Sequence, residues 1–124
     1  MKTKIGYKIV DLQLKSAIMS SSEFVVEYKL NEWVSPKIKE APLMVFDNLY
    51  DAKHFYKGEN RYSYLCIYKC EYQRSKRKWG CCMGFIDDIL RLKKQKKNIT
   101  RRVGRVPYGT VFADAVKLTE RIWV

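Results

Sequence analysis

Apolar and polar residues alternate along much of the chain with a period of two, which is the pattern of half-buried β-strands. The first such stretch, residues 4–10, places Ile5, Tyr7 and Ile9 on one face. Residues 23–30 predict a second strand, because aromatic and β-branched side chains favour the pleated surface. The predicted loops are residues 11–22 and the stretch around Trp33 and Pro36.

The next stretch is a short apolar run, after which the spacing of apolar residues changes from that of a strand to that of a helix. Residues 41–47, bounded by Pro42 and Asp47, predict a buried strand. Residues 48–56 have apolar side chains at helical spacing and predict a helix, with Asp47 or Asn48 as its cap and the Lys57-Gly58 pair as its stop. Residues 86–97 predict another helix, since two aspartates in the first turn and lysines in the last turn complement the helix dipole.

The clearest strand covers residues 61–73. Its alternation places one set of side chains on a single face: Tyr62, Tyr64, Cys66, Tyr68, Cys70 and Tyr72. Such a tyrosine ladder can stack the bases of a single-stranded nucleic acid. It is more often cross-strand packing within a sheet, and we favour that interpretation.

The end of the chain is ambiguous. Residues 98–110 form a basic connector with glycine and proline turn chemistry, and residues 111–124 fit either a strand with a bulge or a short helix. Together the elements predict a single α+β domain over residues 1–124. It would contain a mainly antiparallel sheet of about four to five strands and two to three short helices.

The charge is concentrated in one half of the chain. The net charge is +12, of which residues 61–124 carry +11. Residues 74–105 hold 12 Lys and Arg against Asp87 and Asp88. Such density repels itself unless anions or a well-solvated face relieve it, so the basic half around residues 74–110 is the predicted ligand-binding region.

Arginines and aromatic residues are interleaved in this basic region. Arginine forks hold a phosphate bidentately, lysines add a less directional field, and an aromatic face beside an arginine can stack a base. The candidate ligand-binding residues are Arg101, Arg102, Arg105, Lys78, Trp79, Phe85 and Tyr108. The alternative is a solvated basic face with ordinary core aromatics.

Catalytic and cofactor signatures are absent from the sequence. There is no phosphate-binding glycine loop, dinucleotide fingerprint, zinc-protease motif or serine-hydrolase elbow. The single histidine, His54, has no carboxylate or second histidine in a ligand pattern. The four cysteines match no common zinc spacing, so buried thiols are favoured over a zinc site. We therefore expect neither an enzyme nor a cofactor or metal.

Three stretches carry a family resemblance: GYKIV at residues 6–10, PLMVFDNLYDAKHFY at 42–56 and VPYGTVFADAVKLTERIW at 106–123. Together they resemble small phage and prophage proteins that include the Thoeris anti-defence sponge proteins. The resemblance implies a protein that sequesters a cyclic ADP-ribose signal without degrading it. It also implies oligomers that hold cyclic oligonucleotides at separate sites.

Two binding functions follow as expectations. The first is a sponge for a small cyclic nucleotide, and the second is a basic nucleic-acid-binding protein. An enzyme acting on ADP-ribose-like substrates is a third class. With no signal peptide and no membrane-length apolar run in the sequence, we expect a cytoplasmic protein without a membrane partner. Its aromatic content favours a homo-oligomer.

Overall fold

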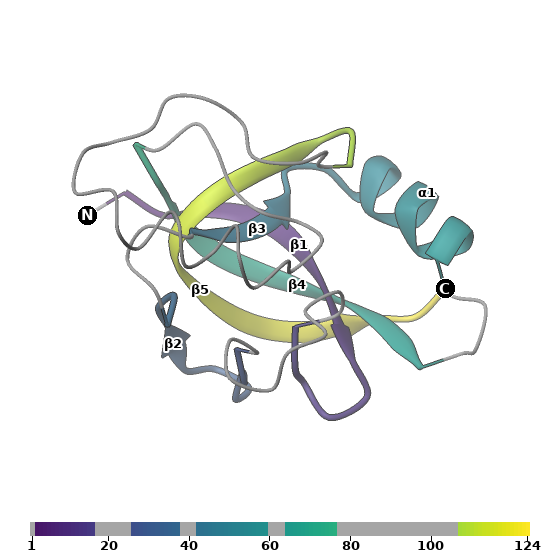
Figure 1. Cartoon of the computed structure of the whole chain (residues 1–124), viewed down its shortest axis with the longest axis horizontal. Coiled ribbons are helices and arrows are strands. Elements are labelled where there is room, and N and C mark those ends of the chain that lie inside the picture. The colour runs from purple at the N-terminus through teal and green to yellow at the C-terminus, as the bar shows by residue number, and fades with distance from the viewer. Residues whose placement is uncertain (1, 17–25, 38–41, 60–63, 77–106) are drawn as a thin grey trace, which may run out of the picture.

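The computed structural model describes residues 2–16, 26–37, 42–59, 64–76 and 107–124. These residues form one small domain of five antiparallel strands and one short helix (Figure 1). The elements are β1 (Lys4–Asp11), β2 (Trp33–Val34), β3 (Leu43–Phe46), α1 (Leu49–Glu59), β4 (Leu65–Arg74) and β5 (Thr110–Ile122).

The sheet closes on itself as a small barrel. Its strand order is β2-β5-β3-β1-β4, and β5 pairs with β4 as well as with β3. The long β5 makes this possible, because its first residues pair with β3 and its later residues pair with both β4 and the short β2. Figure 1 shows β5 curving around the other strands. Closure removes strand edges that would otherwise be free to pair with other chains.

Two extra residues bend β5. Opposite Lys69 and Cys70 of β4, β5 contributes residues 120 and 118, so Thr119 has no cross-strand partner. A second register shift near the start of β5 leaves Asp114 extra in the same way. A bulge of this kind increases local twist and changes which face the following side chains occupy. The structure therefore decides the ambiguity at the chain end in favour of a strand with bulges.

The barrel interior is filled by alternate side chains of the strands. The largest fully buried ones include Val10, Val45, Val116, Leu118 and Cys70. Together with their neighbours they form a single core cluster. At about 25 cal/mol per Å² of buried apolar surface, such a cluster is the main source of stability for a domain of this size.

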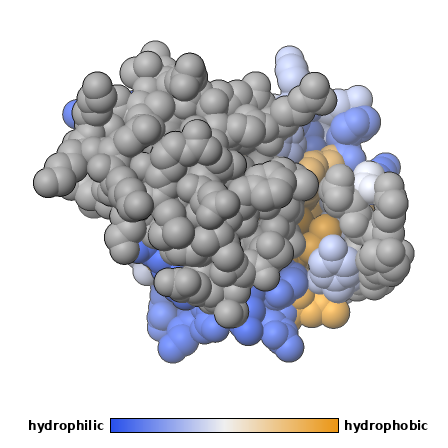
Figure 2. All heavy atoms as spheres, in the orientation of Figure 1, coloured by the Kyte–Doolittle hydropathy of each residue, from blue (hydrophilic) through white to orange (hydrophobic). Residues whose placement is uncertain are grey.

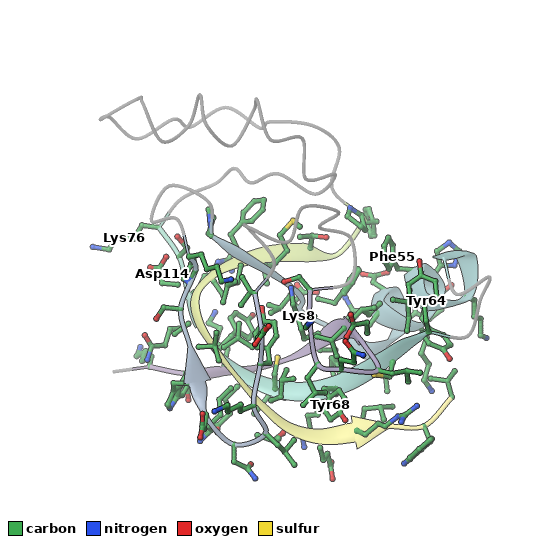
Figure 3. All side chains as sticks on the ribbon, turned by 60° about the horizontal axis from the view of Figure 1, so that its bottom comes forward. Lys8, Phe55, Tyr64, Tyr68, Lys76 and Asp114 are labelled. Carbon is green, nitrogen blue, oxygen red and sulfur yellow. The ribbon has the colours of Figure 1, made fainter. Side chains whose placement is uncertain are left out.

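The seam where β1 pairs with β3 contains a buried lysine and a close contact between a glycine and the neighbouring backbone. Tyr7 lies opposite Phe46 in register, and the ammonium of Lys8 donates a hydrogen bond of 2.6 Å to the carbonyl oxygen of Met44. A Cβ atom at Gly6 would lie 2.8 Å from the carbonyl oxygen of Phe46. The seam therefore needs a residue without a side chain at position 6. Figure 3 shows Lys8 near the centre of the molecule, among the strands.

The helix covers part of the outside of the barrel. Ile9, Phe46, Leu65, Ile67 and Ala52 form a second core cluster, to which α1 adds partly buried apolar residues. The rings of Phe46 and Phe55 lie 5.6 Å apart, centroid to centroid, in a tilted arrangement. Figure 2 shows apolar atoms on the surface beside this helix, while hydrophilic side chains gather along the lower edge of the molecule.

The strands predicted over residues 4–10, 41–47 and 61–73 are confirmed as β1, β3 and β4, and the helix predicted over 48–56 as α1. The count of two to three helices is not matched: the described residues hold one, and the predicted helix at 86–97 lies outside them. None of the helices in the described part of the chain is long and apolar enough to cross a membrane.

The predicted strand at residues 23–30 is wrong for its described part. Residues 26–30 make an isolated bridge, Lys15 to Glu27, and Tyr28 donates its backbone N–H to the carbonyl of Leu14. The period of two in this stretch reflects Val26 and Tyr28, which both point into the barrel core. Conversely, the predicted loop around Trp33 contains β2, because β5 extends far enough to pair with it.

Candidate functional site

Tyr108 is the one predicted ligand-binding residue that lies within the described part of the chain. It is 88% exposed. The other predicted residues, Lys78, Trp79, Phe85, Arg101, Arg102 and Arg105, lie outside the described residues. The described residues hold the two ends of the basic stretch, residues 74–110, and the surroundings of Tyr108.

The basic stretch leaves and rejoins the barrel at one end of the β4–β5 pair. Arg74 lies opposite Ala113, and the backbone N–H of Ser75 donates to the carbonyl of Phe112 at 2.9 Å. On the returning side, Thr110 donates its N–H to the carbonyl of Pro107 at 3.2 Å. Figure 3 shows Lys76 and Asp114 together at this end of the molecule. Both ends of the stretch are therefore anchored on neighbouring strands.

Tyr108 belongs to a turn that rests on the start of α1. Gly109 has a φ of +85°, and a side chain there would collide with the carboxylate of Asp51. The N–H of Asp47 donates to the carbonyl of Gly109 at 3.2 Å. The turn is thus fixed from two sides, while the ring of Tyr108 projects into solvent.

Asn48 organises the helix start beside this turn. Its Oδ1 accepts a hydrogen bond of 2.8 Å from the backbone N–H of Asp51, and its Nδ2 donates to Asp51 Oδ2 at 2.7 Å. Of the two caps that the sequence offers, Asn48 therefore makes the cap. Tyr50, the second residue of α1, is 79% exposed, so the same corner of the molecule carries two exposed tyrosines.

The tyrosine strand is mostly a packing element. Tyr72 is buried, Tyr68 packs partly buried against the inner core, and Tyr64 is exposed. Tyr62 lies outside the described residues. A buried ring cannot offer its face to a base, so the described part of this strand does not form a continuous stacking platform.

The two described cysteines sit in the barrel wall as buried thiols. Burial raises the pKa of Cys70 to about 12, although the nearby Lys8 ammonium lowers it in part. Burial also raises the pKa of the Tyr28 hydroxyl, which lies in the same core cluster. Within the described ranges, no group of three or more His, Cys, Asp or Glu could hold a metal ion. Cys81 and Cys82 lie outside those ranges.

The chain matches no known family model, no curated protein and no solved structure in comparisons with each.

Proposed function

We propose that this protein binds and sequesters a phosphate-bearing small nucleotide through the basic region of residues 74–110, without hydrolysing it. The observation that carries the proposal is the density of cations in a stretch whose two ends are anchored on adjacent strands. The anchoring holds the start and the end of the stretch at one end of the β4–β5 pair. The resemblance to Thoeris anti-defence sponge proteins makes a cyclic ADP-ribose-like nucleotide the first ligand to test.

The arginines of the stretch are the proposed phosphate contacts. Arg101, Arg102 and Arg105 precede the fixed turn at Gly109 by a few residues, and each can hold a phosphate with a planar fork. The ring of Tyr108 is solvent-exposed in this turn, which supports its proposed role as a face for the base. Trp79, Phe85 and Lys78 complete the proposed set.

The direct test is to look for ligand that co-purifies with the protein. Native mass spectrometry would be applied to protein from bacteria with and without an active nucleotide-signalling defence system. The proposal expects an added mass only when the signal is made, and release of an unchanged nucleotide after denaturation. Release of a hydrolysed product would instead show an enzyme. No added mass, together with no binding of cyclic ADP-ribose in equilibrium dialysis, would contradict the proposal.

A second candidate function is sequence-tolerant binding of nucleic acid. It is favoured by the lysines of the same stretch, since a net charge of +10 over residues 74–105 is also the footprint of a phosphate-tracking surface. The two functions differ in salt dependence. A surface that tracks phosphates loses affinity steeply as salt rises, whereas a nucleotide pocket saturates at about one site per chain or per dimer with modest salt sensitivity.

A further inference from the structure

The two most exposed tyrosines of the described residues lie on elements that touch each other. Tyr108 belongs to the turn before β5 and Tyr50 to the first turn of α1, while Tyr28 and Tyr72 are buried in the barrel. A single exposed ring is ordinary on a protein surface. Two such rings on contacting elements place two aromatic faces at one corner of the molecule. We call residues 47–51 and 107–110 the tyrosine corner.

The two halves of the tyrosine corner are fixed to each other by their backbones. The N–H of Asp47 donates to the carbonyl of Gly109 at 3.2 Å, and Gly109 lies against the carboxylate of Asp51. Gly109 follows Tyr108 in the chain, and Asp51 follows Tyr50, so each tyrosine is next to a residue of this contact. A surface whose backbone is already fixed loses little conformational entropy when a ligand binds.

The charge of the tyrosine corner is opposite to that of the basic stretch. The corner contains the carboxylates of Asp47 and Asp51 and no lysine or arginine, whereas residues 74–105 carry a net charge of +10. Asp47 is exposed, and its Oδ1 accepts a hydrogen bond of 2.7 Å from Nδ2 of Asn48, which leaves other lone pairs of the carboxylate for a ligand. A carboxylate repels a phosphate but accepts hydrogen bonds from ribose hydroxyls and base amino groups.

The proposed phosphate contacts are close to this corner along the chain. Arg105 precedes Tyr108 by three residues, and three residues span at most about 11 Å. An arginine that suits a phosphate therefore lies near an acidic, aromatic surface that does not. A ligand with a phosphate at one end and a base at the other matches this division of charge.

We infer that Tyr50 joins Tyr108 in the ligand site and that the tyrosine corner takes the nucleoside end of the ligand. The inference rests on the proposed function, in which arginines of the basic stretch hold the phosphates. The base stacks on the tyrosine rings, and the carboxylate of Asp47 accepts a hydrogen bond from the ribose or the base. The site therefore selects a nucleotide over a phosphate compound that has no base.

The ring signals of the tyrosines provide a direct test on the full chain. In protein with ¹³C-labelled tyrosine, single Tyr→Phe variants assign the signals of Tyr50, Tyr108 and Tyr64 among the nine. The probes are cyclic ADP-ribose and inorganic pyrophosphate. We expect cyclic ADP-ribose to shift the Tyr50 and Tyr108 signals saturably while the Tyr64 signal stays in place. Pyrophosphate has no base and should leave both corner signals unmoved.

Three variants separate stacking from other effects on affinity. Tyr50→Leu removes the ring, Tyr50→Phe keeps it, and Tyr64→Leu removes another exposed tyrosine, which lies just before β4 and outside the corner. Because the ring of Tyr50 is exposed, its loss leaves the core intact. In titration calorimetry with cyclic ADP-ribose, we expect Tyr50→Leu to lower the affinity about tenfold, on the scale of one stacked base. Tyr50→Phe and Tyr64→Leu should stay within about twofold of the wild type.

The outcomes separate this inference from the proposed function. If Arg102→Lys weakens binding of cyclic ADP-ribose and Tyr50→Leu does not, the inference is overturned and the proposed function stands. A loss in Tyr50→Phe or Tyr64→Leu as large as that in Tyr50→Leu, or an equal shift of the corner signals with pyrophosphate, would also overturn the inference. No binding of cyclic ADP-ribose by the wild type would contradict the proposed function and this inference with it.

Discussion

The hydroxyl of Thr119 donates a hydrogen bond of 3.0 Å to the backbone carbonyl of Lys69. Thr119 is the extra residue of the β5 bulge, so this contact ties the bulge to β4 at the point where the register shifts. The register beyond it turns Ile122 outward, toward the core cluster under α1, and Arg121 inward. One hydroxyl therefore helps to determine which faces the last residues of β5 occupy.

Thr119→Val should lower the free energy of unfolding by about 1 kcal/mol, because it keeps the shape and β-propensity of the side chain but removes its hydrogen bond. Thr110→Val is the matched control. Thr110 is also a partly buried residue of β5, and its hydroxyl makes no hydrogen bond within the described residues. Urea denaturation of both variants gives the comparison. Equal losses would show that the Thr119 contact does not stabilise the bulge.

Gly109→Ala should destabilise the fold by more than about 2 kcal/mol. The residue has a φ of +85°, where an L-residue is strained, and its new side chain would meet Asp51, which Asn48 holds in place. Gly58→Ala is the contrasting variant, because Gly58 lies in α1 with nothing near its Cβ position. It should stabilise the protein by about 0.5 kcal/mol. Thermal unfolding measures both, and a tolerated Gly109→Ala would contradict the turn geometry.

Stability should fall at alkaline pH, in part through Cys70. Burial raises the pKa of its thiol to about 12 in the folded protein, against about 8.5 in an unfolded chain. The contribution of the protonated Cys70 thiol to the free energy of unfolding is fully present below about pH 8.5. It is lost as the pH rises toward 12, because the thiol of the unfolded chain releases its proton at a lower pH than the buried thiol does. One proton corresponds to a slope of about 1.4 kcal/mol per pH unit.

Cys70→Ala should therefore flatten the slope of stability between about pH 9 and 11. The cavity that it leaves lowers stability at every pH, so the slope and not the absolute value is the measurement. Part of the alkaline loss of stability should remain in the Cys70→Ala variant, because burial also raises the pKa values of Tyr28 and Tyr72. Denaturation series at several pH values provide the data. A slope identical to that of the wild type would show that the thiol does not titrate as expected.

Self-association is expected from the exposed apolar surface. Ile5 and Trp33, which flank the Glu71–Lys117 pair on the outer face, are 52% and 42% exposed, and Leu12 and Leu30 are exposed as well. Surfaces that gather such residues favour contacts between copies of a chain. Sedimentation at micromolar protein should therefore show a dimer or a larger symmetric species. A single species of 14.8 kDa would contradict this expectation.

The strands and the helix were predictable where the period of apolar residues reflects burial. Residues 4–10 alternate because Tyr7 and Ile9 pack on the outer face of β1, in the cluster under α1, so the apolar period there marks the outer face, while Lys8 and Val10 lie on the barrel face. The same alternation at Val26 and Tyr28 was misleading, since two side chains that point into the barrel from a segment outside the strands give the same signal as a strand. Barrel closure was not predictable, because it depends on the length of β5 and on two bulges that the period alone does not show.

The candidate site was predictable only in part. Charge density and arginine–aromatic interleaving are visible in the sequence and indicated the 74–110 region. The fixed turn that carries Tyr108 was not, because it depends on contacts of Gly109 with Asp47 and Asp51 of a distant part of the chain.

The measurement that tests the central claim most directly is titration calorimetry of cyclic ADP-ribose against wild-type protein and Arg102→Lys, at low and at high salt. Arg91→Lys is the control, because it makes the same exchange in the basic stretch at a residue outside the proposed set. A bidentate phosphate pocket predicts saturable wild-type binding at both salts, a loss of about tenfold or more for Arg102→Lys, and little change for Arg91→Lys. Equal affinities of all three proteins at both salts would contradict a specific arginine pocket.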